Sequence, residues 1–170
     1  ARVTDLHGRL DRVLCLHCED GFDREQVQQR LLRDNPFLVE GGAQPRPDGD
    51  ADLADEVLAR LRVPACERCG GVLMPDVVFF GGSVPRERVT ACQEALAAAD
   101  ALLVAGSSLQ VYSGFRFCRQ AVALGKPIAI LNPGLSRADG LATLRLHGPA
   151  ETLLPDLAAR LLTAPTAARA

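Results

Sequence analysis

The sequence predicts an α/β fold: a parallel sheet covered by helices, preceded by a small module that carries cysteines. From about residue 76, strand-length apolar runs alternate with helical stretches, an order that is typical of a parallel sheet. Before that point turn formers are frequent, and four of the six cysteines stand in two Cys-x-x-Cys pairs. These observations place a zinc-binding module over residues 9–75 and part of a Rossmann-like sheet over residues 76–163.

The composition excludes several classes of protein. The 170 residues carry 19 basic and 21 acidic side chains, so the net charge of −2 offers no basic surface for nucleic acid. Aromatic residues make up 4% and tryptophan is absent, which argues against a surface that stacks bases. No apolar run is long enough to span a membrane. We therefore expect neither nucleic acid nor membrane as a partner.

The first half is expected to contain few regular elements. Residues 1–16 alternate short apolar and polar stretches, which predicts short extended segments and turns. Asp23, with Gln26 three residues later, resembles a capping box, and apolar residues then recur at helical spacing until Asn35–Pro36 ends the helix. A loop and a short helix are expected over residues 41–52 and 53–61.

The second half is expected to alternate strands and helices. Pro85 suits the first position of a helix, and Gly125 suits a left-handed cap after one. Strands are expected over residues 77–80, 101–105, 127–131 and 141–146. Helices are expected over residues 85–100, 115–124 and 153–162. Cys92 and Cys118 fall on helical stretches and are interpreted as core residues.

The paired cysteines have the spacing of two knuckles that bind one metal ion. The predicted ligands are Cys15, Cys18, Cys66 and Cys69. Four thiolates in a tetrahedron favour zinc and leave no open position, so the site is expected to be structural. Two redox dithiols, four buried cysteines, or His17 in place of one sulfur are the alternatives. The 47 residues between the pairs are expected to loop out as a helical insertion.

Two polar turns follow neighbouring strands of the predicted sheet. Gly106–Ser108 follows the apolar run 101–105, and Asn132–Gly134 follows the run 127–131. One such turn is most often an ordinary connection, but two at adjacent strand ends form a crevice that favours a nucleotide. No glycine fingerprint, phosphate loop or serine elbow is present. His7 would be a general base if it lies in that crevice, since imidazole titrates near neutral pH; otherwise it is structural.

Several motifs together resemble one family. They are Thr4-Asp5-Leu6-His7-Gly8, the two cysteine pairs, Pro75-Asp76-Val77-Val78-Phe79-Phe80-Gly81, Gly106-Ser107-Ser108-Leu109-Gln110-Val111-Tyr112-Ser113-Gly114, Ile128-Ala129-Ile130-Leu131-Asn132 and Arg137-Ala138-Asp139. This set resembles the C-terminal part of the sirtuins, NAD-dependent protein lysine deacylases, and is most similar to the class II branch that includes mitochondrial sirtuin 4. The resemblance implies that residues 1–170 form a single sirtuin-like catalytic domain that is incomplete at its N-terminus.

The resemblance also implies roles for individual residues. His7 corresponds to the catalytic histidine, which takes a proton from a ribose hydroxyl of NAD while the acyl group passes from lysine to ADP-ribose and nicotinamide leaves. The residues implied in NAD binding are Gly106, Ser107, Ser108, Asn132, Pro133, Gly134 and Ala150. Those implied in contact with the acyl-lysine protein substrate are Val78, Phe79 and Gly81. Gly82 stands where the family commonly has an acidic residue.

Two further functions are alternatives to deacylation. One is transfer of ADP-ribose to protein. The other is a catalytically incomplete module that binds zinc and protein, because the family's Gly-Ala-Gly-x-Ser and Thr-Gln-Asn-x-Asp segments precede the matched region. NAD and zinc are the expected cofactors. The cytoplasm of a bacterium or the mitochondrial matrix of a eukaryote is the expected location.

Overall fold

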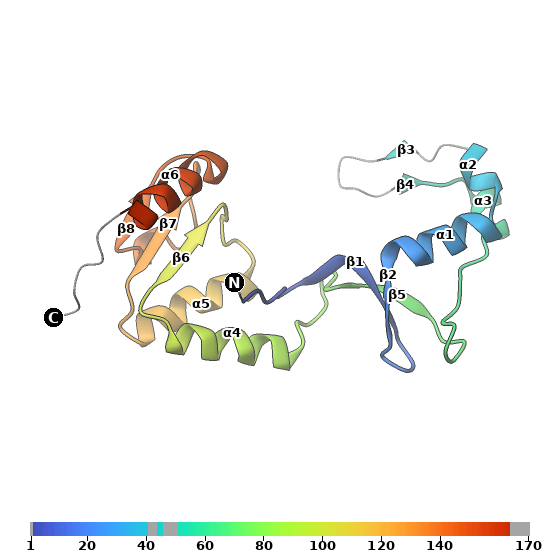
Figure 1. The fold of residues 1–170 in the computed structure, drawn as a ribbon, viewed down its shortest axis with the longest axis horizontal. Helices are drawn as coiled ribbons and strands as arrows, with labels where there is room; N and C mark the ends of the chain where they lie inside the picture. Colours follow the sequence, from blue (N-terminus) through green and yellow to red (C-terminus); the bar gives the residue numbers. More distant parts are fainter. Residues whose placement is uncertain (1, 41–43, 46–50, 164–170) are drawn as a thin grey trace. The chain divides into compact units, whose positions relative to one another are not determined.

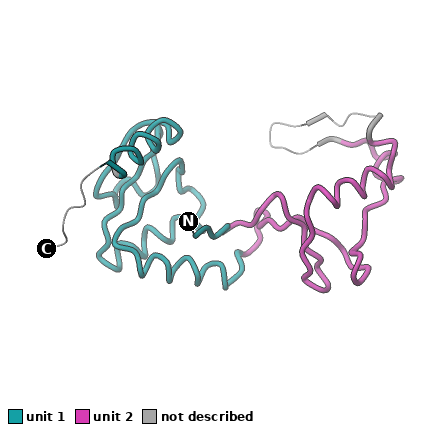
Figure 2. The backbone as a smooth tube through the Cα atoms, viewed as in Figure 1, with its two compact units in different colours: residues 1–6, 84–170 teal, residues 7–83 magenta. Residues whose placement is uncertain are grey.

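A computed structural model gives the fold of residues 2–40, 44–45 and 51–163 (Figure 1). The chain divides into two compact units (Figure 2). Unit 1 comprises residues 1–6 and 84–170, and unit 2 comprises residues 7–83. Each unit contains its own three-stranded sheet.

Unit 2 is built on an antiparallel sheet. Its strands are β1 (Gly8–Cys15), β2 (Gly21–Asp23) and β5 (Leu73–Val77), in the order β2-β1-β5. Val13 of β1 faces Phe22 on one side and Pro75 on the other, and it is buried. The expectation of short segments over residues 1–16 is thus wrong in part, because pairing on both sides makes residues 8–15 one strand.

Helix α1 (Arg24–Asp34) follows β2 directly. Asp23 caps it by accepting a hydrogen bond from the backbone N–H of Gln26 at 3.1 Å, and the helix ends before Asn35, as predicted. The remaining short elements of unit 2 are α2 (Phe37–Glu40), β3 (Gln44–Pro45), β4 (Ala51–Asp52) and α3 (Asp55–Arg60). The short predicted helix is confirmed. In the predicted loop 41–52, β3 pairs with β4, and the other residues of that loop lie outside the described part of the chain.

The strand predicted at residues 77–80 is wrong beyond its first residue. The backbone N–H of Gly82 donates to the carbonyl oxygen of Phe79 at 2.9 Å, and Gly81 has a φ of 83°. This is a tight turn with glycine at its third position, where a positive φ is required. The side chains of Phe79 and Phe80 are therefore exposed rather than buried in a sheet.

Unit 1 contains a parallel sheet, as predicted. Its strands are β6 (Leu102–Ala105), β7 (Ile128–Leu131) and β8 (Leu144–Leu146), in that order, and Ala105 pairs with Leu131. The helices are α4 (Arg86–Ala98), α5 (Tyr112–Ala123) and α6 (Ala150–Thr163), with a short 3₁₀ turn η1 (Asp139–Leu141) after β7.

The core of unit 1 lies between the sheet and its helices. Ile128 and Ile130 of β7 are almost fully buried, and Cys118 and Ala121 of α5 are wholly buried against them. The interpretation of Cys118 as a core residue is confirmed, and burial raises the pKa of its thiol. Cys92 is only half-buried.

Helix starts in unit 1 differ from their expected positions. Pro85 caps α4 from an extended conformation instead of occupying its first turn. α5 and α6 begin at Tyr112 and Ala150, three residues earlier than predicted, because polar and small residues there still join the helical hydrogen bonds. Gly125 adopts the predicted left-handed cap, with a φ of 66°.

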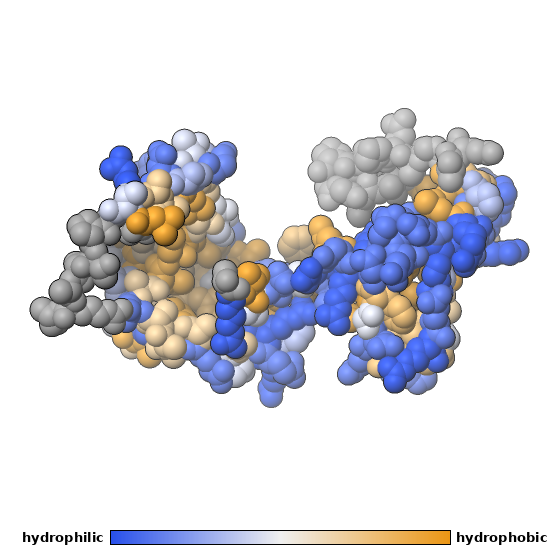
Figure 3. All heavy atoms as spheres, in the orientation of Figure 1, coloured by the Kyte–Doolittle hydropathy of each residue, from blue (hydrophilic) through white to orange (hydrophobic). Residues whose placement is uncertain are grey.

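One edge of the sheet in unit 1 carries apolar side chains at the surface. Leu103 of β6 is 47% exposed, and Figure 3 shows apolar surface over the strands of this unit. Within the described residues, β6 pairs with β7 alone. No helix in the described part of the chain is long and apolar enough to cross a membrane.

Candidate functional site

The four paired cysteines of unit 2 form a cluster that could hold a metal ion. Their sulfur atoms all lie within 4.8 Å of one another. The Sγ atoms of Cys15 and Cys69 are 3.5 Å apart, and those of Cys18 and Cys66 are 3.7 Å apart. Zinc–sulfur bonds of about 2.3 Å in a tetrahedron separate the sulfurs by about 3.8 Å, so the donor set fits zinc. His17 does not join the cluster.

The two knuckles have the same backbone conformation. In the first, Cys15 donates its N–H to Asp20 at 2.9 Å, and the N–H of Glu19 returns to the Cys15 carbonyl at 3.0 Å. In the second, the N–H of Cys66 donates to the carbonyl oxygen of Gly71 at 2.9 Å, and the N–H of Gly70 donates to the Cys66 carbonyl at 2.8 Å. The fourth residue after the first cysteine has a positive φ in both, 61° at Glu19 and 72° at Gly70. A glycine occupies this position in the second knuckle, whereas the first knuckle has a glutamate there.

Within the cluster, the pKa values of the Cys15 and Cys69 thiols shift in opposite directions. The backbone N–H of Cys18 lowers the pKa of Cys15 to about 6, and the N–H of His17 adds to this. The N–H of Gly71 favours the thiolate of Cys69, but the neighbouring Cys18 sulfur and the loss of hydration outweigh it and raise the pKa of Cys69 to about 12. The cluster therefore resists full ionisation, and a bound divalent cation would remove that resistance.

His7 lies at the start of unit 2, next to the predicted substrate segment. Its carbonyl oxygen accepts the backbone N–H of Val78 at 2.8 Å, and the next residue, Gly8, pairs with Val77. Gly8 has a φ of 88°, and a Cβ there would lie 1.9 Å from the carbonyl oxygen of Asp76. Only glycine allows the two strands to come this close. Gly8 is a positioning residue that the sequence showed only as part of a motif.

In unit 1, the predicted cofactor residues converge at the carboxyl ends of the parallel strands. The backbone N–H of Gly106 donates to Leu131 at 2.9 Å, and that of Asn132 donates to Leu146 at 3.1 Å. A Cβ built on Gly106 would lie 3.7 Å from the Cβ of Ala150, so the start of α6 lies beside the first turn. The two polar turns and Ala150 thus form one edge of unit 1, where parallel α/β proteins bind ligands.

Internal hydrogen bonds shape both turns. The Oγ of Ser107 accepts the backbone N–H of Leu109 at 3.2 Å, and Leu109 has a positive φ of 55°. The Nδ2 of Asn132 donates to the carbonyl oxygen of Gly134 at 3.0 Å. Asn132 is buried and Ser107 is half-buried, whereas Gly106, Ser108, Pro133 and Gly134 are exposed.

Arg145 of β8 stabilises the turn at residues 132–134, although it is not part of that turn. Its guanidinium donates to the carbonyl oxygens of Asn132, at 3.1 Å, and Gly134. The side chain of Arg145 is 16% exposed. Sequence reasoning missed this residue, because an arginine in a strand has no motif that distinguishes it from a solvated charge.

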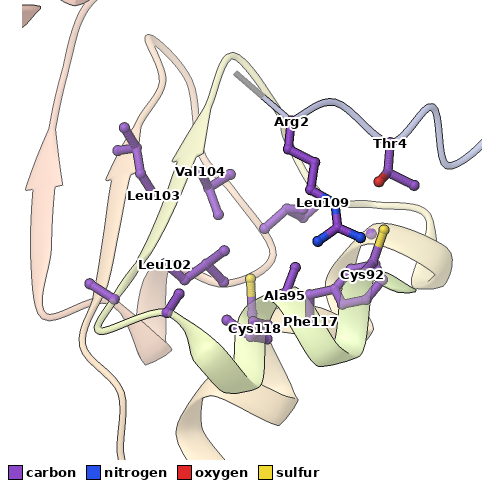
Figure 4. Close-up of a pocket in the computed structure, with 14 residues that line it drawn as sticks. Arg2, Thr4, Cys92, Ala95, Leu102, Leu103, Val104, Leu109, Phe117 and Cys118 are labelled. Atoms are coloured by element: carbon purple, nitrogen blue, oxygen red, sulfur yellow. The ribbon is translucent and has the colours of Figure 1, made fainter. Parts of the chain in front are cut away.

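A groove of unit 1 lies apart from the predicted cofactor residues. It has a volume of about 630 Å³ and is lined mainly by apolar residues of β6, α4 and α5, together with Arg2, Thr4 and Leu109. None of the residues predicted to bind the cofactor lines it. Figure 4 shows Arg2 extending from the N-terminal segment toward this groove, with Cys92 and Phe117 on its helical side. Its lining lacks the convergent polar groups that a nucleotide site needs.

The fold combines a unit with a parallel α/β sheet and a second unit that carries four clustered cysteines able to hold a metal ion. The Sir2 family model matches residues 1–113. The chain belongs to the Sir2 family, which confirms the resemblance to the sirtuins.

Curated relatives agree with this assignment. The chain is 56% identical over 145 residues to an NAD-dependent protein deacetylase of Xanthomonas campestris pv. campestris (strain 8004), which covers 85% of the chain and 50% of the relative. It is 49% identical over 157 residues to NAD-dependent protein deacetylase 1 of Streptomyces coelicolor, which covers 91% of the chain and 52% of the relative. The chain thus spans about half the length of the curated relatives it matches.

Solved structures share the fold. A structure described as Sir2Tm bound to a propionylated peptide aligns with a TM-score of 0.70 at 22% identity, covering 96% of this chain and 58% of that one. A structure described as Sir2-p53 peptide-NAD+ aligns with a TM-score of 0.69, also at 22% identity, covering 96% of this chain and 57% of that one.

Proposed function

We propose that the chain serves NAD-dependent deacylation of lysine side chains in proteins, with transfer of the acyl group to ADP-ribose and release of nicotinamide. The observation that carries this proposal is the convergence of the two polar turns and Ala150 at one edge of unit 1, in a chain whose relatives are named NAD-dependent protein deacetylases. Because those relatives are about twice as long as the matched region, the reaction is proposed for this chain joined to the remainder of such a protein.

Seven residues of unit 1 are proposed to hold NAD. They are Gly106, Ser107, Ser108, Asn132, Pro133, Gly134 and Ala150. The positive φ and missing side chain of Gly106 leave room for a ligand close to the backbone, which supports a ribose or phosphate contact. NAD, when bound, supplies the ribose carbon that loses nicotinamide and the ADP-ribose that accepts the acyl group.

His7 is proposed to act as the general base. Its imidazole would take a proton from a ribose hydroxyl and later return it, which requires the neutral ring. The hydrogen bond between the His7 carbonyl and Val78 fixes the backbone that carries this ring, and the absence of a side chain at Gly8 makes that contact possible. A step that depends on neutral imidazole loses rate as the pH falls.

The segment from Val78 to Gly81 is proposed to receive the acyl-lysine peptide. Phe79 is 57% exposed and Phe80 is fully exposed, which is unusual for phenylalanine and favours contact with a partner. Val78 lies beside His7, so the peptide contacts and the general base share one part of unit 2.

The cysteine cluster is proposed to bind zinc as a structural ion. Four thiolates close the coordination sphere, so no position remains for a reacting water. The unpaired cysteines support a reducing compartment, which in a bacterium is the cytoplasm. Membership of the class II branch stays a prediction.

The experiment that tests this function uses a chimera. The chain replaces the matching 145-residue region of the Xanthomonas campestris relative, and the chimera is incubated with an acetyl-lysine peptide with and without NAD. We expect O-acetyl-ADP-ribose and free lysine peptide only when NAD is present. His7→Ala should lower the rate by at least ~100-fold, the range for a lost general base, while His147→Ala, an exposed histidine outside the motifs, should not.

Other products would support the alternatives. ADP-ribosylated protein in place of the deacylated peptide would favour ADP-ribosyl transfer. A chimera that folds, binds zinc and gives no heat change on titration with NAD would favour the incomplete binding module. Equal turnover of the His7→Ala variant would contradict the role given to His7.

A further inference from the structure

The helical insertion between the two knuckles is fastened to the second knuckle by side-chain hydrogen bonds. Asn35, at the end of α1, is fully buried. Its Nδ2 donates to the carbonyl oxygens of Leu31 at 2.7 Å and Arg62 at 2.8 Å, and its Oδ1 accepts the backbone N–H of Arg62 at 2.7 Å. One amide therefore joins α1 to the segment that leads into Cys66.

Arg30, one turn earlier on α1, makes a second connection closer to the metal ligands. Its guanidinium donates to the carbonyl oxygen of Ala65 at 2.6 Å and lies 3.4 Å from the carboxylate of Glu67. These two residues flank Cys66 on either side. The Arg30 side chain is only 17% exposed, whereas that of its partner Glu67 is 65% exposed.

A third contact, an ion pair, joins the second knuckle to the residue that follows Glu19 of the first. Arg68, between the ligands of the second knuckle, lies 3.2 Å from the carboxylate of Asp20, which follows the first knuckle. That pair is largely exposed, so it contributes little by itself. The side chains of Asn35, which is fully buried, and of Arg30, which is mostly buried, are better placed to hold the second knuckle.

We propose that Arg30 and Asn35 are positioning residues of the metal site. They hold residues 62–67 against α1, which itself follows the first knuckle, so that the two pairs of sulfurs are assembled before an ion binds. If the ligands already lie together in the metal-free chain, its affinity for zinc is higher, because zinc binding does not have to order the second knuckle. Zinc is also released more slowly, since the second knuckle cannot move away from the ion while the first knuckle remains bound to it.

Zinc release from the chain itself tests the proposal. The zinc-loaded chain is mixed with an excess of a chromophoric chelator, and the transfer rate is followed by absorbance. We expect Arg30→Met to release zinc about tenfold faster, the lower end of the range for outer partners of metal ligands. Arg33→Met is the matched control, because Arg33 is on the same helix but, among the described residues, its side chain pairs with its neighbour Asp34 alone. It should release zinc at the wild-type rate.

A second variant and a second measurement separate positioning from general destabilisation. Arg30→Lys keeps a donor for Ala65 and should restore most of the slow release. Asn35→Ala removes all three side-chain bonds of the amide and should accelerate release further. In the metal-free chain, hydrogen exchange at residues 66–71 should rise in Arg30→Met and stay unchanged in Arg33→Met.

Three outcomes would contradict the proposal. Wild-type release rates in both Arg30→Met and Asn35→Ala would contradict it, as would the same acceleration in Arg33→Met. A wild-type chain that takes up no zinc would do so too. None of these measurements involves NAD or a peptide, so they are independent of the proposed deacylation.

Discussion

Asp139 and Arg145 form a largely buried ion pair, with 3.0 Å between Oδ1 of Asp139 and Nε of Arg145. Oδ2 of Asp139 also accepts the backbone N–H of Ser136 at 3.1 Å. Since Arg145 in turn holds two carbonyl oxygens of the turn at residues 132–134, these two charges connect both ends of the loop that follows β7. The loop is therefore ordered by side chains outside the turn that is proposed to contact NAD.

Replacing Arg145 should loosen this loop. Arg145→Met removes the charge-assisted bonds to the turn and leaves the Asp139 carboxylate without its partner, at a cost of about 2 kcal/mol. We expect faster hydrogen exchange at residues 132–139, and in the chimera a higher Kd for NAD with little change in zinc content. Arg119→Met, on the exposed face of α5, is the control. Unchanged exchange in Arg145→Met would show that the loop does not depend on this ion pair.

A side chain at Gly8 should disrupt the strand pairing that positions His7. Gly8→Ala places a Cβ 1.9 Å from a backbone oxygen at a φ of 88°, so the strands must separate. The expected loss of stability is at least ~2 kcal/mol. Gly140→Ala is the control, because its Cβ would meet nothing within 4 Å. Equal denaturant midpoints for the two variants would contradict the prediction.

Gly71 and Gly70 should respond differently to the same change. A Cβ on Gly71 would lie 2.9 Å from the Sγ of Cys15 and 3.2 Å from that of Cys69, so Gly71→Ala should crowd the sulfurs and weaken zinc binding. A Cβ on Gly70 would meet nothing within 4 Å, but its φ of 72° should make Gly70→Ala cost about 1 kcal/mol of stability. Competition with a chelator measures the first effect and urea unfolding the second. Equal zinc affinity in wild type and Gly71→Ala would contradict the crowding.

Metal removal should affect the two units unequally. The four ligands all belong to unit 2, whereas the core of unit 1 is formed by buried apolar side chains of its own. After chelation we expect hydrogen exchange to rise around the knuckles and to stay slow in β7 and α5. Restored protection on adding zinc is the control. Equal loss of protection in both units would show that unit 1 depends on the ion.

Local signals predicted much of this protein correctly. Asp23 caps α1 and Gly125 ends α5 because each depends on a few neighbouring residues. The cysteine pairs predicted that four sulfurs come together, and each knuckle closes through backbone hydrogen bonds within six residues. The apolar run after Val77 was misleading, because a strand exists only where a partner pairs with it, and here a turn follows.

The sequence by itself determined the elements that short-range chemistry specifies: two knuckles, the capped helices, the buried strands of a parallel sheet and the family to which the motifs point. Tertiary structure alone decided which distant groups meet. It brought Asn35 and Arg30 to the second knuckle, Arg145 to the turn after β7, and Gly8 against Asp76. Contacts of this kind depend on how the chain packs across long separations, and no local pattern of residues encodes them.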